Sequence, residues 1–187
     1  YDGAAWTQPA VVSEDGTADF SPSVCVSNKK AYIVWQNAEA AFDAADQNLN
    51  AAKIAKNMGI CAAEFKPASQ TFTVKALTQP DNVLDMQPAI SASGNTVTVA
   101  WVQNTDNEWF GAGNNNNILT SSFDGSAWSD AAPAAEKLTP VTSLAVDCQG
   151  EKRNIAYTTD TDGDLNTTED HELYVNGKKV TENDAAE

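Results

Sequence analysis

The sequence predicts an all-β fold in which repeated four-stranded antiparallel sheets stack as blades of a β-propeller. Two landmarks recur at one offset, because Pro22 and Pro88 are 66 positions apart and so are Trp35 and Trp101. A degenerate third copy follows at an offset of 56, with Tyr157 in place of the tryptophan. Repeats of about 50–66 residues, each with four short strands, are typical of propeller blades. A β-sandwich of stacked domains is the alternative, but one unit is too small to bury its own core.

The repeat also predicts the domain organisation. The first seven residues (YDGAAWT) match residues 123–129 (FDGSAWS) at an offset of 122, the sum of the other two offsets. We therefore expect a single partial propeller domain over residues 1–187, about three and a half blades long, with units at 1–19 (partial), 20–80, 81–139 and 140–187. A propeller typically closes with four or more blades, so we expect that further blades or another chain complete it.

Each unit supplies its strands in the same order. The first strand has small side chains at residues 24–26, 89–92 and 144–146, and the second carries the Trp35, Trp101 or Tyr157 position. The third is expected at residues 60–65, 118–123 and 173–175, and the fourth at residues 72–77, near Trp128 and at 179–181. Asn176-Gly177 predicts a type I′ hairpin turn. Helical spacing of Ala41, Phe42, Ala45 and Leu49 predicts a short helix in the first long loop.

One hairpin resembles a known motif. The segment from Ser122 to Trp128 (SFDGSAW) resembles the Asp-box of sialidase-type propellers of secreted bacterial proteins, although Asp124 and Gly125 are adjacent, one residue closer than in that family. The resemblance implies that Asp124 caps turn amides, that Gly125 takes a positive φ, and that Trp128 fills the gap between blades. Sialidases of this fold use an arginine triad, whereas this chain has one arginine, Arg153, so we assign no catalytic residue within it.

Composition restricts the classes of partner. The net charge of −15 repels phosphate backbones, so we expect no nucleic-acid ligand. No apolar run approaches the roughly 20 residues of a membrane span. The three cysteines (Cys25, Cys61 and Cys148) have no metal-binding spacing and allow at most one internal disulfide. The acid-rich composition suits an extracellular or cell-surface protein.

An acidic segment predicts a calcium site. Oxygen-bearing side chains alternate along the loop from residue 160 to 170, and Ca²⁺ takes six to eight oxygen ligands. The loop resembles the calcium loops of integrin-like propeller repeats but not an EF-hand. A solvated acidic loop is the alternative. The expected ligands are Asp160, Asp162, Asp164, Asn166, Glu169 and Asp170.

A second loop predicts a ligand site. Trp109 and Phe110 lie outside the strand pattern, flanked by Asp106 and Glu108. These side chains could stack on a sugar ring and bind its hydroxyls, or Trp109 could fold back over its own blade. Because the loops between second and third strands leave one rim of the scaffold, we expect the binding site there. His171, the one histidine, is expected at the surface.

We therefore expect a non-catalytic extracellular module, such as a bacterial adhesin, that binds a glycan or a protein, with Ca²⁺ as its cofactor. A sialidase-like hydrolase of glycans, with most catalytic residues outside this segment, is the alternative. A structural spacer in a long surface protein is a third hypothesis.

Overall fold

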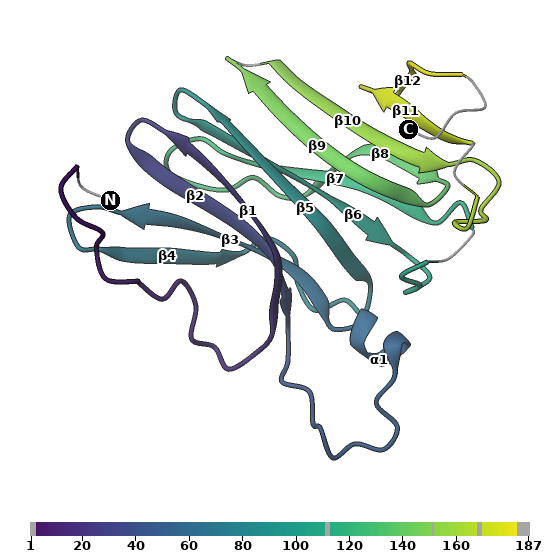
Figure 1. The fold of residues 1–187 in the computed structure, drawn as a ribbon, viewed down its shortest axis with the longest axis horizontal. Helices are drawn as coiled ribbons and strands as arrows, with labels where there is room; N and C mark the ends of the chain where they lie inside the picture. Colours follow the sequence, from purple (N-terminus) through teal and green to yellow (C-terminus); the bar gives the residue numbers. More distant parts are fainter. Residues whose placement is uncertain (1–2, 111–112, 151, 168–169, 183–187) are drawn as a thin grey trace.

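The protein is described by a computed structural model covering residues 3–110, 113–150, 152–167 and 170–182. Apart from one short helix, its regular elements are strands, which form three four-stranded antiparallel sheets (Figure 1). This arrangement confirms the all-β propeller-blade class predicted from the repeat. Within the described part of the chain, no helix is long and apolar enough to cross a membrane.

Each sheet follows the order of its strands in the sequence. The first contains β1 (Asp19–Ser27), β2 (Lys30–Ala38), β3 (Met58–Lys66) and β4 (Thr71–Ala76). The second contains β5 (Leu84–Ser93), β6 (Thr96–Asn104), β7 (Asn116–Phe123) and β8 (Ala132–Leu138). The third contains β9 (Val141–Gln149), β10 (Lys152–Asp160), β11 (His171–Val175) and β12 (Lys178–Lys179). We call these sheets blades 1, 2 and 3.

The blades stack through their faces, with the first strands β1, β5 and β9 side by side (Figure 1). One apolar core joins blade 1 to blade 2 and includes Val34, Ile60, Val99 and Trp101, all 3% exposed or less. A second core joins blade 2 to blade 3. Nearly continuous apolar runs on β2 and β6 are explained by this stacking, because both faces of a central strand are covered.

The repeated tryptophan keeps a repeated partner. The indole N–H of Trp35 donates to Asp19 Oδ1 at 2.6 Å, and that of Trp101 donates to Asp85 Oδ1 at 2.9 Å. In blade 3 the equivalent of Asp85 is Val141, and the aromatic residue is Tyr157, which stacks on Tyr174 with 5.3 Å between ring centroids. The acid is therefore present in the two blades where a buried indole N–H needs an acceptor.

One face of blade 1 is open where the equivalent face of blade 2 is covered. Val24 is 63% exposed, whereas Ile90, its equivalent 66 positions later, is 8% exposed because blade 1 packs over it. Val12 of the N-terminal segment covers part of this open face near Trp35. Closure by further blades or another chain stays a prediction.

The turn between β7 and β8 has the geometry that the sequence predicts. Asp124 Oδ1 accepts hydrogen bonds from the backbone N–H groups of Ser126 and Ala127 at 2.8 and 2.9 Å. Gly125 has a φ of +98°, and Trp128 packs against Phe123 and the core between blades 1 and 2. These contacts give the turn a structural role.

Two local expectations differ from the structure. The strands expected of the partial first unit are absent from residues 3–18, because a lone hairpin without a neighbouring sheet is barely stable. The helix α1 spans Ala51–Ala55, downstream of the predicted positions, and is capped by Asn50, whose side chain accepts from Lys53 N–H at 3.0 Å. Upstream, Asp43 and Asp46 each bond the N–H two residues later, and such local turns compete with helix.

The three cysteines are free thiols. Burial raises the pKa of Cys61 to about 12, with the carboxylates of Asp15 and Asp19 adding to the shift. Burial likewise raises the pKa of Cys25 to about 11. Both thiols therefore stay protonated near neutral pH and act as small apolar side chains.

Candidate functional site

The long loops between second and third strands meet on one rim, as the sequence predicts. They cover residues 39–57 in blade 1, 105–115 in blade 2 and 161–170 in blade 3. The first two meet where Trp109 Nε1 donates to the carbonyl of Ala51 at 3.1 Å. The second and third line one cleft. Residues from all three blades are thus brought to the same end of the stack (Figure 1).

Asn104 positions the loop that carries the aromatic residues. It ends β6, is 2% exposed, and its Oδ1 accepts from the N–H groups of Asp106 at 3.1 Å and Glu108 at 3.0 Å. An asparagine is suited to this place because its short amide satisfies backbone donors that leave a strand. The direction of the loop is therefore fixed from a buried residue.

The two aromatic residues take different positions. Trp109 is half-buried, packs on the core between blades 2 and 3, and uses its N–H for the bond to Ala51. It therefore reaches across to blade 1 as well as covering its own blade. Phe110 is 83% exposed. Both rings nevertheless line the same cleft, so the predicted pair offers one fixed ring and one exposed ring.

The cleft between blades 2 and 3 has a volume of about 360 Å³. Glu108, Trp109 and Phe110 of the blade 2 loop line it together with Leu165 and His171 of blade 3. Its remaining lining comes from β5, the ends of β6 and β7, and the start of blade 3: Met86, Gln87, Asn104, Asn116, Pro140, Val141 and Thr142. Apolar side chains with a few polar groups are the usual lining of a small-molecule site.

Gln87 is a cleft residue that sequence reasoning missed. Its Nε2 donates to the carbonyl of Val141 at 3.2 Å, which links blade 2 to blade 3, while its buried Oε1 accepts no hydrogen bond from the residues that the structure describes. Gln87 has a φ of +53° at the β-bulge of β5, and Ser21 has a φ of +51° at the equivalent place in β1. The repeat places the two residues in register, each directly before a repeated proline, Pro22 or Pro88, and proline within a strand is typical of a bulge.

The two acids of the aromatic loop are separated. Glu108 lines the cleft, and its part in ligand binding stays a prediction. Asp106 accepts a hydrogen bond from the side chain of Asn115 and does not line the cleft. That bond ties the two ends of its own loop, and the part of Asp106 in ligand binding stays a prediction.

The acidic loop brings together three of the predicted cation ligands. Asp160, Asp162 and Asp170 place one carboxylate oxygen each within 4.8 Å of one another. Asp164 Oδ1 instead accepts from the backbone and side-chain N–H groups of Asn166 at 3.1 and 2.7 Å. Glu169 lies outside the described residues. The alternating pattern of oxygen-bearing residues could not show which carboxylates converge and which form hydrogen bonds within the loop.

Asp160 is the buried member of this cluster. Its side chain is 0% exposed, and burial raises its pKa, with the carboxylates of Asp170 and Asp162 adding to the shift. The backbone N–H of Gly163 and the nearby imidazole lower it. His171 Nε2 lies 3.3 Å from Asp160 Oδ2, and the imidazole is 14% exposed. The prediction of a surface histidine was therefore wrong.

A second cavity, of about 340 Å³, contains a carboxyl with a shifted pKa. It lies between blades 1 and 2 and is lined by Asp81, Asp85, Trp101 and Trp128, among others. Burial raises the pKa of Asp85 to about 7 against the lowering effect of the Trp101 hydrogen bond. Such a carboxyl resembles a general acid. However, Asp19 makes the same bond to its tryptophan in blade 1, so we interpret Asp85 as part of the repeated core.

Comparisons with known proteins agree with this fold. No family model matches the sequence, and no curated protein matches it. Among solved structures, the α-L-arabinofuranosidase of Lactobacillus brevis is similar over 100% of this chain and 60% of its own, with 18% identity and a TM-score of 0.51. A family 117 glycoside hydrolase of Zobellia galactanivorans is similar over 90% and 56%, with 11% identity and a TM-score of 0.53.

A third solved structure has a similar fold. The Hadza microbial sialidase Hz136 is similar over 82% of this chain and 34% of its own, with 11% identity and a TM-score of 0.53. The chain therefore spans about 60% or less of the length of each of these enzymes. The likenesses establish that the three blades have the fold of propeller proteins, several of which act on glycans.

Proposed function

We propose that this chain is part of an extracellular propeller protein that acts on glycans, and that the cleft between blades 2 and 3 binds part of the glycan. The observation that carries the proposal is the convergence of Phe110, Gln87 and Glu108 on one cleft. A sugar presents C–H groups on its ring faces and hydroxyl groups at its edges. An aromatic ring suits the first, and amide or carboxylate oxygens suit the second.

Gln87 supports this class of ligand. A buried acceptor without a donor costs free energy, and a hydroxyl group of a bound sugar would supply the missing hydrogen bond. Glu108 adds an exposed acceptor to the lining of the same cleft. The likeness of the fold to arabinofuranosidases and sialidases favours a glycan over a protein ligand.

A purely binding function is the second candidate. Hydrolysis of glycosidic bonds generally uses a pair of carboxyl groups about 5–10 Å apart. Among the described residues that line this cleft, Glu108 is the one acid. The cleft therefore supports binding by itself, and hydrolysis would need carboxyl groups from elsewhere in the protein.

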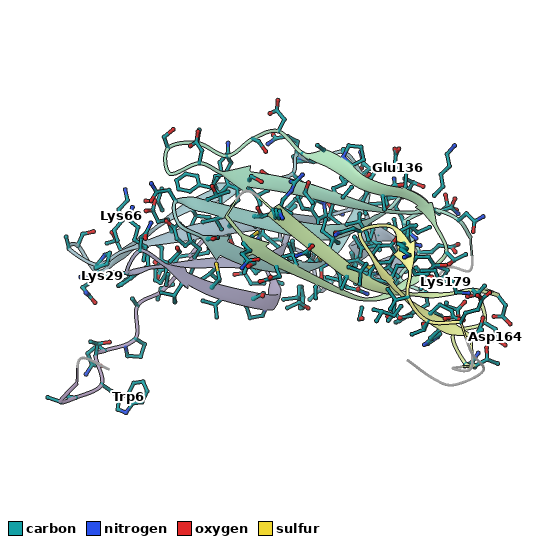
Figure 2. All side chains as sticks on the ribbon, turned by 90° about the horizontal axis from the view of Figure 1, so that it is seen from above. Trp6, Lys29, Lys66, Glu136, Asp164 and Lys179 are labelled. Carbon is teal, nitrogen blue, oxygen red and sulfur yellow. The ribbon has the colours of Figure 1, made fainter. Side chains whose placement is uncertain are left out.

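A glycan array that includes arabinose- and sialic-acid-containing oligosaccharides tests the binding proposal. Loss of the Phe110 ring removes about 1.5–3 kcal/mol of apolar contact, so Phe110→Ala is expected to weaken binding about tenfold or more. Trp6→Ala is the matched control, because Trp6 is also 83% exposed and lies at the far end of the molecule from the acidic loop around Asp164 (Figure 2).

Equal binding by the wild type and Phe110→Ala would contradict the proposed cleft. Fluorogenic arabinosides and sialosides, tested with the longest natural form of the protein, separate the two functions. Hydrolysis would support the glycan-acting enzyme. Binding without hydrolysis would favour the non-catalytic module.

A further inference from the structure

The acidic cluster of blade 3 has carboxylate oxygens that the protein itself leaves without donors. One oxygen of each acid is held by the loop backbone: Asp160 by Gly163 N–H, and Asp170 by the N–H groups of Thr161 and Asp162 at 3.1 and 2.8 Å. The other oxygens, Asp160 Oδ2 and Asp170 Oδ1, are buried and accept no hydrogen bond among the described residues. The backbone therefore fixes the carboxylates, while the second oxygen of Asp170 has no hydrogen-bond donor and that of Asp160 has only the nearby imidazole of His171 among the described residues.

A buried carboxylate oxygen without a partner needs compensation. Asp160 is fully buried, and no lysine or arginine of the described residues forms an ion pair with Asp160, Asp162 or Asp170. The one basic neighbour is His171, whose Nε2 lies 3.3 Å from Asp160 Oδ2. A single imidazole cannot balance three carboxylates, and repulsion between them is strongest at Asp160, the buried member of the cluster.

We propose that Asp160, Asp162 and Asp170 bind a divalent cation, and that this cation is Ca²⁺. Their oxygens lie within 4.8 Å of one another, so one ion can contact all three. Carboxylate ligands favour hard cations, and Ca²⁺ accepts the irregular geometry that a loop provides, whereas Mg²⁺ requires a near-ideal octahedron. Asp162 is exposed, which leaves a side of the ion open to water.

The cation would fix the loop between β10 and β11. Asp160 ends β10, and Asp170 immediately precedes β11, so one ion joins the two ends of the loop. Leu165 of this loop and His171 line the proposed glycan cleft. A cation that fixes the loop would therefore also fix part of the lining of the cleft. The cation site does not depend on the proposed glycan binding, because its test needs no glycan.

Thermal melting and calorimetric titration with CaCl₂ test the site, using metal-free protein. For the wild type, Ca²⁺ at 100 times its Kd is expected to raise Tm by roughly 5–10 °C, because a ligand that binds only the folded state stabilises it. Asp162→Asn replaces a charged carboxylate ligand by a neutral amide and is expected to abolish most of this shift. Asp164→Asn is the matched control, since Asp164 is an exposed acid of the same loop that bonds Asn166.

Three results would overturn the proposal. The first is an unchanged wild-type Tm at about 10 mM Ca²⁺, which exceeds the Kd of weak extracellular sites. The second is an equal loss of the shift in Asp162→Asn and Asp164→Asn, which would indicate general screening of the acidic charge. The third is an equal shift with Mg²⁺, which would refute the assignment to Ca²⁺. A shift specific for Ca²⁺ that Asp162→Asn loses and Asp164→Asn keeps would support the site.

Discussion

Replacing Asp85 by asparagine tests how the repeated Trp–Asp pair is stabilised. Burial raises the pKa of Asp85 from 3.8 to about 7, so the folded protein holds this proton more tightly than the unfolded chain does. The resulting stability is fully present below pH 3.8 and is lost as the pH rises toward 7. Between pH 5 and pH 8 this single group should lower the free energy of unfolding by about 2–3 kcal/mol.

Asp85→Asn keeps an oxygen acceptor for the Trp101 indole and cannot ionise. Relative to the wild type, the variant should therefore gain about 2–3 kcal/mol between pH 5 and pH 8, as measured by urea unfolding at each pH. Asp19→Asn is the matched control, because Asp19 makes the same bond in blade 1 and is exposed. A variant that follows the wild type across this range, or gains no more than the control does, would refute the reasoning.

Three further results are expected. Ile90→Ala should lower the free energy of unfolding by about 2–5 kcal/mol in urea unfolding, whereas Val24→Ala at the equivalent exposed position should change it by less than about 0.5 kcal/mol; equal losses would contradict the open face of blade 1. Asn176→Ala should cost about 1–3 kcal/mol in the same assay, because it removes an acceptor for Ile155 N–H at a φ of +50°, and no loss would contradict this. At pH 7.5, Cys61 should react with a thiol reagent only after denaturation, as burial raises its pKa to about 12, and rapid native labelling would contradict that burial.

Much of the fold could be predicted because the repeat preserves what each blade needs. The position of the second strand could be predicted from its tryptophan, since Trp35 and Trp101 lie at the offset of the repeat and both are buried. The acids that pair with them are also in register, 16 residues before each tryptophan, although they lie outside the apolar pattern that marks the strands. A repeated acid at a fixed distance from a repeated indole is a signal that the sequence does contain.

The site was less predictable, because it depends on contacts between blades. The composition of both loops pointed to binding sites, but the cleft that Phe110 and His171 line together follows from the stacking of blades 2 and 3. Gln87 joined them through a β-bulge with positive φ, which no glycine marked. The sequence pattern also could not show that Asn115 and Asn166 form hydrogen bonds to Asp106 and Asp164, whose predicted parts as ligands stay predictions.

The most direct test of the account is a crystal structure of the protein with the oligosaccharide that binds most strongly on the array. We predict sugar density between blades 2 and 3, with a ring face on Phe110 and a hydroxyl within hydrogen-bond distance of Gln87 Oε1. Density in the cavity beside Asp85, or on the open face of blade 1, with none in this cleft, would contradict the account.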